Sequence, residues 1–432
     1  MDQESTIRLN EVQVSELRSL TESVTLARLQ FARQIGMTHA GQRDTYTVLG
    51  YPETISTAEY RDLYARGGIA GSCVDALPEA VWRGDGDVIE DQDPEVETAF
   101  EAAWWLLNDR LKVWPTLQRL HIQASLTSFS VLFLGAPGDW QTELPRATKP
   151  EDLWYITPFG GGVTNADRTT ARGTTSTYGT DAVVDKWDED ISSPRFGQPL
   201  TYQLRRTNIS APELQRPVHW SRVIHVPAKG FLDDAVYGPP TLERVFNYFI
   251  DLMKVAGGGA EASWLNANPI TQWDTDPEMS FSSPQDAQAH VDSMKAKAQL
   301  IRDQMQRWIE TRGVKAKQLG ATASDFSNNV DAVVRLIAGT LRIPKRILDG
   351  SEAGVLASDQ DRNNWNDQVK DCRSSYAHPI ILRPFVQRLI DYNYLPKPKQ
   401  WEPHWPEVAA MSEVEKLAAA ETMVKLNDHG EK

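Results

Sequence analysis

The chain has 432 residues, 41% hydrophobic and 24% charged, a balance typical of a folded protein with two or three domains. Its formal net charge of -14 argues against tight DNA binding, because proteins that bind duplex DNA tightly usually hold phosphates with a strongly basic face. It does not exclude an acidic wall along which DNA slides without sticking, because such a wall repels phosphate.

The sequence shows no pattern typical of a membrane helix, a signal peptide or a set of disulfides. No apolar run of 18 or more residues occurs, so we expect no membrane helix and no membrane partner. The N-terminal sequence MDQESTIRLNEVQ lacks the basic start and apolar stretch of a signal peptide, so synthesis in a cytoplasm is expected. Cys73 and Cys372 are too far apart in sequence to indicate a disulfide framework or a zinc site.

The first 127 residues are predicted to be helical. Apolar residues recur every three or four positions from Val14 to Leu29, as on one face of a helix. A Ser/Thr cap with Glu59 near the helix start, followed by Gly67 and Gly68, brackets a second helix. The predicted helices cover residues 14–36, Thr57–Arg66, Ile69–Trp82, Asp93–Asn108 and Trp114–Thr127.

In residues 129–230 the helical periodicity gives way to alternating apolar residues separated by Gly, Pro and Thr. This pattern predicts an antiparallel layer of strands, with a Gly/Thr-rich loop at residues 159–182. The expected strands are Phe129–Leu134, Trp154–Thr157, Val183–Trp187, Leu200–Leu204 and Val223–Val226.

Helical periodicity returns at Pro240. Leu242, Val245, Phe246 and Phe249 share one face of a helix predicted over residues 240–264, which Gly257–Gly259 would loosen. A second helix, predicted over residues 285–312, carries apolar residues at alternating steps of three and four, a heptad-like seam. The seam residues are Val291, Met294, Ala298, Ile301, Met305 and Trp308.

The remainder alternates helices with breaks. Val314–Leu319 is a predicted edge strand, and Asn329–Arg342 is a predicted helix that Pro344 ends. After the loop KRILDGSEAGVLASD, a helix is predicted over Gln360–Tyr376, with interruptions at Pro379 and Pro384. A hinge, PKPKQWEPHWP, leads to a last predicted helix, Glu407–Leu426.

No catalytic signature is present. The chain lacks G-x-S-x-G, H-E-x-x-H, a P-loop, and a G-x-G-x-x-G between a strand and a helix. The eight histidines include no i, i+4 pair on a helix, so neither a metal site nor a cofactor is predicted. The 14 tryptophans and 59 acidic residues leave a carbohydrate-active enzyme open as an alternative, although core and interface positions explain the tryptophans better.

Four ordered segments resemble the portal family of tailed bacteriophages. They are LYARGGIAGSCVDALPEAVWRGD, PVHWSRVIHVPAKG, YGPPTLERVFNYFIDLM and IAGTLRIPKRILDGSEAGVLASDQDRNNWNDQV, which start at residues 63, 217, 237 and 337. Each is weak alone, but their order and spacing are family-like over most of the chain. Pro239 and Pro240 depart from the pattern, since small polar residues are commoner there.

The resemblance implies an α+β portal fold that assembles into a dodecameric ring. Its regions, in chain order, would be a wing of helices and antiparallel strands (residues 1–239), a first stem helix (240–264), a small clip (265–328), a second stem helix (329–343), a tunnel loop (344–358), returning wing helices (359–400) and the start of a crown (401–432).

The resemblance also implies roles for particular residues. Packing between neighbouring clips would bury the heptad-like seam. The basic residues nearest the bore, and so the candidates to face DNA, are Lys254, Arg335, Arg342, Lys345 and Arg346. The tunnel loop that borders the channel would contain Gly350, Ser351, Glu352, Ala353, Gly354, Val355 and Leu356.

The implied function is non-enzymatic. A ring at one capsid vertex of the virion, assembled in the host cytoplasm, would pass double-stranded DNA without sequence preference during packaging, retention and ejection. Its partners would be the terminase large subunit, the major capsid protein and scaffold, and the head–tail adaptor. Another virion structural protein, such as an adaptor or minor head protein, remains an alternative.

Overall fold

The computed structural model describes residues 44–91, 97–161, 180–206, 217–230, 235–267, 270–275, 283–302, 314–319, 326–350 and 358–407. The helix expected over residues 14–36 lies outside these ranges, as does the helix expected at Glu407–Leu426 apart from its first residue. The chain divides into a first unit, residues 1–246 with 338–432, and a second unit, residues 247–337. Within the described ranges no helix combines the length and apolar character that crossing a membrane requires.

The N-terminal helices of the first unit are α2 (Thr45–Leu49), α3 (Thr57–Arg66), α4 (Ile69–Val81), α5 (Ala99–Leu111) and α6 (Val113–Leu126). The predicted bounds of α3 are confirmed, and its start is fixed by a capping box between Ser56 and Glu59. A second capping box, between Thr98 and Glu101, starts α5 at Ala99. The helix predicted from Asp93 therefore begins later than expected, because Thr98, five residues on, caps its first turn; Asp93 itself lies outside the described residues.

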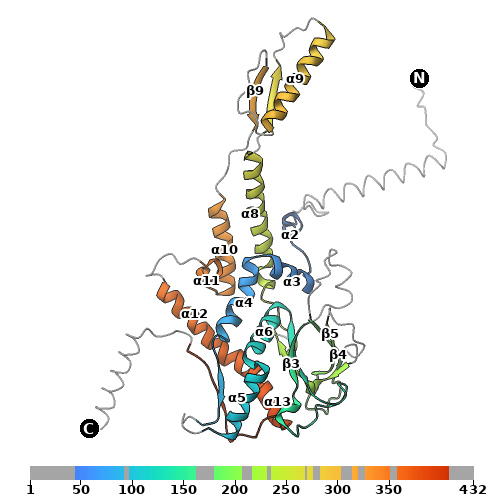
Figure 1. The fold of residues 1–432 in the computed structure, drawn as a ribbon, viewed down its shortest axis with the longest axis vertical. Helices are drawn as coiled ribbons and strands as arrows, with labels where there is room; N and C mark the ends of the chain where they lie inside the picture. The colour runs from blue at the N-terminus through green and yellow to red at the C-terminus, as the bar shows by residue number, and fades with distance from the viewer. Residues whose placement is uncertain are drawn as a thin grey trace, which may run out of the picture. The chain divides into compact units, whose positions relative to one another are not determined.

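A six-stranded sheet forms beside these helices (Figure 1). Its strands, in spatial order, are β6 (Pro217–His219), β5 (Pro199–Arg206), β4 (Thr180–Trp187), β3 (Tyr155–Gly161), β2 (Phe129–Gly135) and β7 (Val223–Pro227). The prediction of a wholly antiparallel layer was wrong, because β3 and β4 pair in parallel through Gly160–Asp181 and Gly161–Ala182. Residues 162–179 connect the end of β3 to the start of β4. Parallel strands need a crossover connection of about a dozen or more residues, and this connection is long enough.

Strand β2 is buried at every position and carries the core on both of its faces. Phe129, Val131 and Phe133 point to one face and join an apolar cluster with residues of β3, β4 and β5. Ser130 alternates with them and donates a hydrogen bond of 2.8 Å to the Leu120 carbonyl of α6. Helix α6 therefore covers the opposite face of the sheet.

In the C-terminal part of the first unit, α11 (Lys345–Asp349) precedes a continuous helical run. The run consists of α12 (Ser358–Cys372), a π-helix (Arg373–Leu382) and α13 (Arg383–Asp391). Pro379 and Pro384 do not interrupt it as predicted. Pro379 lies within the wider π-helical turns and Pro384 lies in the first turn of α13, where a missing amide donor costs less. Beyond this run, β10 (Glu402–His404) pairs antiparallel with β1 (Asp87–Ile89).

The second unit has a strand–helix–strand order between two helices. Helix α8 (Phe246–Ala267) precedes β8 (Ile270–Thr275), α9 (Pro284–Arg302), β9 (Val314–Leu319) and α10 (Ser327–Leu341), and β8 pairs antiparallel with β9. The predicted bounds of β9 are confirmed. The predicted helix start at Pro240 was wrong, because only a short 3-10 turn (Glu243–Val245) precedes α8 and the Thr241 amide bonds the Ser125 carbonyl instead.

The glycine run at residues 257–259 lies inside α8 and does not end it. Gly257 and Gly258 are exposed, whereas Gly259 is buried against the residue that precedes α10. A Cβ at Gly259 would lie 2.7 Å from the Phe326 ring, so only glycine allows this close approach.

Candidate functional site

The basic residues expected to face DNA fall into two groups. Lys254 on α8 lies 3.3 Å from Asp251, and Arg335 on α10 lies 2.7 Å from Asp331. Both pairs lie within their own helix and are largely solvent-exposed, so each contributes little to stability. Each of the two basic side chains thus has a carboxylate partner on its own helix, and whether either faces DNA stays a prediction.

The other three basic candidates lie close together in the first unit. Arg342 follows α10 in the left-handed region, with φ of 57°, and is exposed. Lys345 and Arg346 are half-buried on α11. Whether any of these side chains faces DNA stays a prediction.

The expected tunnel loop, residues 344–358, begins with structure that the sequence did not predict. Its first third is α11, and Gly350 ends this helix with φ of 65°, a conformation that glycine adopts without strain. The expectation of a loop from Pro344 was therefore wrong over Lys345–Asp349. The remaining candidates lie outside the described residues: Ser351, Glu352, Ala353, Gly354, Val355 and Leu356.

The heptad-like seam is only partly described. Helix α9 is described as far as Arg302. Val291 is 45% exposed and Met294 is half-buried, whereas only the backbone of Ala298 and Ile301 is described. Met305 and Trp308 lie outside the described residues, so burial of the seam between subunits stays a prediction.

The segment His219–His225 forms a buried scaffold that sequence reasoning missed. Arg222 is fully buried and donates to the carbonyls of Thr142, Ala136 and Pro137 at 3.0, 3.2 and 2.9 Å. The neighbouring Ser221 Oγ accepts a hydrogen bond of 2.8 Å from the Leu144 amide. The Ser-Arg pair of this segment therefore fastens residues 136–144 to the sheet.

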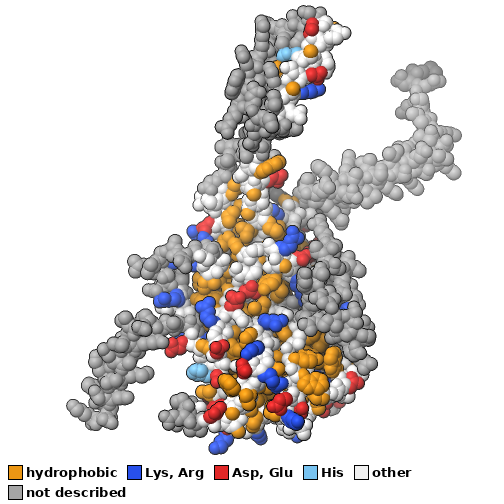
Figure 2. Space-filling view, in the orientation of Figure 1, with side chains coloured by type: hydrophobic (Ala, Val, Ile, Leu, Met, Phe, Trp, Pro, Cys, Tyr) orange, Lys and Arg blue, Asp and Glu red, His pale blue; other side chains and the backbone are white. Residues whose placement is uncertain are grey.

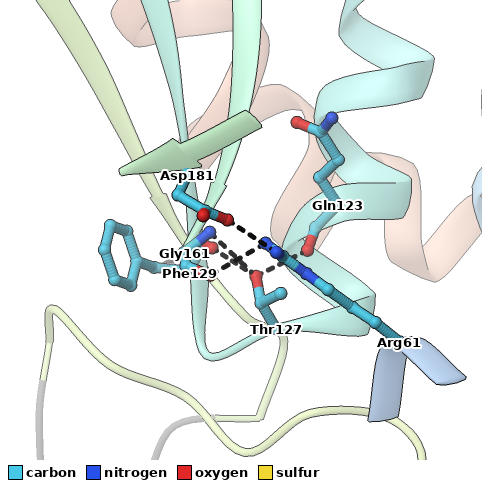
Figure 3. A network of polar contacts seen from close by, with 6 residues as sticks. All are labelled: Arg61, Gln123, Thr127, Phe129, Gly161 and Asp181. Carbon is cyan, nitrogen blue, oxygen red and sulfur yellow. Dashed lines mark hydrogen bonds and ion pairs between the residues drawn. The ribbon is translucent and has the colours of Figure 1, made fainter. Parts of the chain in front are cut away.

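A polar network joins two helices to the parallel strand pair (Figure 3). Arg61 of α3 reaches Asp181 of β4 with an Nη1–Oδ1 distance of 2.6 Å and donates to the Gly161 carbonyl at 3.3 Å. Thr127, at the end of α6, accepts from the Gly161 amide at 3.2 Å. The ion pair is mostly buried, with side-chain exposures of 17% and 11%.

We expect Arg61→Met to lower the free energy of unfolding by about 2 to 3 kcal/mol, because Asp181 would keep its charge in a nearly buried position after losing the guanidinium that faces it. Chemical denaturation of the variant measures this loss. The double variant Arg61→Met/Asp181→Asn should recover part of it, and an undiminished loss in the double variant would show that the ion pair is not its cause.

His121 is a buried histidine held by aromatic neighbours. Trp82 Nε1 donates to its Nδ1 at 3.1 Å, and the Tyr376 ring lies 5.0 Å away between centroids. Burial, with a smaller contribution from Lys229, lowers the pKa of His121 to about 3. The folded protein therefore keeps this imidazole neutral at pH values where the unfolded chain protonates it.

This shift predicts acid sensitivity. Since the pKa of His121 is lower in the folded than in the unfolded state, stability falls as pH drops below about 6.5, by about 2 kcal/mol from pH 7 to pH 5. His121→Gln keeps an acceptor for Trp82 but does not titrate. Denaturation curves at both pH values should show a loss smaller by about 2 kcal/mol in the variant; equal losses would contradict the assignment.

A tryptophan cluster fixes the last described residues to the first unit. The rings of Trp82 and Trp114 lie 5.3 and 5.1 Å from that of Trp405, between centroids. Arg373 donates to the Pro406 carbonyl at 2.6 Å and to the Val81 carbonyl at 2.9 Å. The Pro/Trp-rich segment expected as a hinge is thus packed against α4 and α6 at its C-terminal end.

The first unit has two further surface features. Helices α4, α11 and α12 border a groove of about 650 Å³. Apolar side chains also reach the surface on the sheet side of this unit (Figure 2), and the loop between β4 and β5 carries Ile191 with 85% exposure and Phe196 with 56%. Among the described residues, no cluster of three or more His, Cys, Asp or Glu side chains could hold a metal ion.

Comparisons with known proteins place these features in a family. A family model described as phage portal protein matches residues 58–427. No curated protein matches the chain. Solved structures that resemble it include the neck of an empty gene transfer agent particle computed with C6 symmetry, with a TM-score of 0.48, 15% identity, and coverage of 87% of this chain and 88% of the other.

Two further structures extend the comparison. The neck of a native gene transfer agent particle computed with C12 symmetry gives a TM-score of 0.47 at 16% identity, covering 86% of this chain and 88% of the other. An HK97-family phage portal protein from Corynebacterium diphtheriae gives 0.36 at 10% identity, covering 81% and 94%. At these TM-scores the structural likeness is noted without further argument, and the family match rests on the sequence.

Proposed function

The chain belongs to the phage portal protein family, since the family model spans residues 58–427, and from this premise we propose that it forms the ring through which DNA enters and leaves a capsid. As a portal protein it is a virion component of a family whose role is structural. The family match is the observation that carries the proposal. No catalytic step is assigned to any residue.

Exposed apolar side chains on the second unit support assembly. Met253 and Trp264 on α8 are 58% and 66% exposed, and Leu336 on α10 is 52% exposed. Large apolar side chains gathered on a small unit are typical of surfaces that a partner covers. In the proposed ring, the same helices of neighbouring copies cover them.

The proposed regions follow the expected order along the chain. Residues 1–239 and 359–400 form the wing, α8 and α10 are the stem helices, and β8, α9 and β9 belong to the clip. The second unit, residues 247–337, overlaps the range proposed for stem and clip. The clip is the proposed docking surface for the terminase motor and the head–tail adaptor, and residues 401–432 begin the crown.

The proposed channel handles DNA without reading its sequence. A chain with a net charge of -14 presents mainly repulsive walls, and a ring repeats each basic residue in every copy. Lys254 and Arg335 are the proposed stem contacts, and Arg342, Lys345 and Arg346 the proposed contacts near the tunnel loop. ATP hydrolysis belongs to the motor in this scheme.

Negative-stain images of the purified chain test ring formation. We expect rings with a central hole, and a mass equal to a multiple of the single chain. Compact single copies that hydrolyse a glycan would favour the carbohydrate-active alternative. Single copies without such activity that bind an already formed ring would favour an adaptor or minor head protein.

The tunnel loop provides a test of function that is separate from assembly. Deletion of residues 350–358 should leave rings intact but should impair packaging or retention of DNA in assembled particles. Packaged DNA is measured by nuclease protection. Loss of rings in the deletion variant would assign the loop a structural role instead.

A further inference from the structure

The groove of the first unit has an apolar lining. Helices α4, α11 and α12, which lie together on one side of this unit (Figure 1), enclose about 650 Å³. Trp365 of α12 and Ile347 of α11 line it and are 8% and 38% exposed. Pockets that enclose a ligand typically measure about 300 to 1,000 Å³, so this groove has room for several side chains of a partner.

The α4 side of the groove suits a second helix. Ser72, Ala76 and Ala80 line it at intervals of four residues, so small side chains form a row along the helix surface. The side chains of a packed helix insert between rows of this spacing, and small residues in a row let the two helices approach closely. Helix α4 thus presents a helix-packing surface that the described residues leave open.

Charge alone does not identify the occupant of the groove. Asp75 and Glu79 line it together with Arg83, so both signs are present. Asp75 also accepts hydrogen bonds of 3.0 and 3.2 Å from Tyr64 Oη. The occupant is therefore best identified by position, as a segment that starts beside the groove.

The described part of the chain ends beside one end of this groove. Gly84 directly follows the groove residue Arg83, and a Cβ at Gly84 would lie 3.2 Å from the Pro406 ring. Arg373 also fixes Pro406, because it donates to the Pro406 carbonyl at 2.6 Å. Residues 408–432 therefore continue from a fixed point near the C-terminal end of α4.

The sequence after this point has the pattern of a helix with one apolar face. A helix is predicted over Glu407–Leu426, and in its first half Met411, Val414 and Ala418 follow one another at steps of three and four. At about 1.5 Å per residue, a helix over residues 408–420 would be about as long as α4, which has 13 residues. Such a helix would span the groove if it turned back along α4.

We propose that residues 408–420 fold back as a helix antiparallel to α4 of the same copy and occupy the groove. Met411, Val414 and Ala418 then pack against the row of small residues on α4. The contact forms within one copy, so it goes beyond the proposed ring and does not depend on it. In a ring, it would hold the start of the proposed crown against the first unit.

Cysteine cross-linking tests the contact directly. The native Cys73 and Cys372 are buried, so they add little background. Under mild oxidation, the double variant Ala76→Cys/Val414→Cys should form a disulfide within one chain, seen by mass spectrometry as the loss of both added thiols.

The matched control for the cross-link is Ala76→Cys/Lys416→Cys. Position 416 would lie on the opposite face of the proposed helix from Val414, so this pair should keep its thiols. Equal cross-linking of the two pairs would contradict the proposal, as would a disulfide that joins separate chains.

A second measurement covers the case in which the paired cysteines disturb packing. Ala80→Cys should react with a maleimide at least tenfold more slowly in the full chain than in a chain that ends at Glu407, because only the full chain can cover the groove. Leu106→Cys, at a position on α5 that is 62% exposed, should react equally fast in both. Equal rates for Ala80→Cys in the two chains would overturn the proposal. Both measurements can be made on single copies, so their outcome is separate from that of the test for rings.

Discussion

Arg222→Met should lower the free energy of unfolding of the first unit by about 3 to 5 kcal/mol, the typical loss when a buried charged network loses one partner. The guanidinium is fully buried and bonds three backbone carbonyls at 2.9 to 3.2 Å. Methionine fills similar space but donates no hydrogen bond, so these carbonyls would lose their side-chain donor. Chemical denaturation measures the loss.

The size of this effect depends on burial and on the number of bonds. Burial lowers the pKa of Arg222, a cost of desolvation that the three carbonyls offset. Arg66→Met is the matched control, because Arg66 is exposed in the last turn of α3 and should change stability by less than about 0.5 kcal/mol. A similar, small effect at both positions would contradict a structural role for Arg222.

Gly86→Ala should destabilise the first unit by at least about 3 kcal/mol, at the upper end of overpacking. A Cβ at Gly86 would lie 1.8 Å from an atom of the Trp114 ring. That ring is 3% exposed and lies 5.1 Å from both Trp82 and Trp405, between centroids, so it has no free space to enter. Thermal unfolding followed by tryptophan fluorescence measures the change.

The control for this substitution is another glycine. A Cβ at Gly257 in α8 meets nothing within 4 Å, so Gly257→Ala should be neutral or stabilise the helix by up to about 1 kcal/mol. If Gly86→Ala is equally well tolerated, the tryptophan cluster does not hold residues 405 and 406 as described.

Local periodicity and capping predicted much of the fold. The bounds of α3 and β9 were predicted to the residue, and the strand–helix–strand order of the second unit was also confirmed. These features depend on residues close together in sequence, such as the capping pair Ser56 and Glu59. Predicted helix starts were wrong where a residue far away in the sequence determines them. At Thr241, for example, the backbone amide donates to the Ser125 carbonyl and not within the predicted helix.

Long-range features were missed for the same reason. The pairing of β1 with β10 joins residues 87–89 to 402–404, and no short pattern in the sequence links them. The parallel pair β3–β4 and the continuous helical run through Pro379 also depend on the surrounding packing.

For the candidate site residues, the sequence predicted which basic side chains lie on which helices but not which residues they contact. Lys254 and Arg335 lie on the predicted helices, yet their ion pairs with Asp251 and Asp331 emerged only from the structure. The Ser221-Arg222 pair lies in a segment that carried the family resemblance. Its bonds to residues 136–144 give that segment a structural explanation.

A reconstruction of the assembled protein by electron cryo-microscopy tests the central proposal most directly. The proposal predicts identical copies around one axis, an open central channel bordered by α8 and α10, and Lys254 and Arg335 facing the channel. A closed twofold dimer, a single copy at all concentrations, or a ring with α8 and α10 turned away from the axis would contradict it.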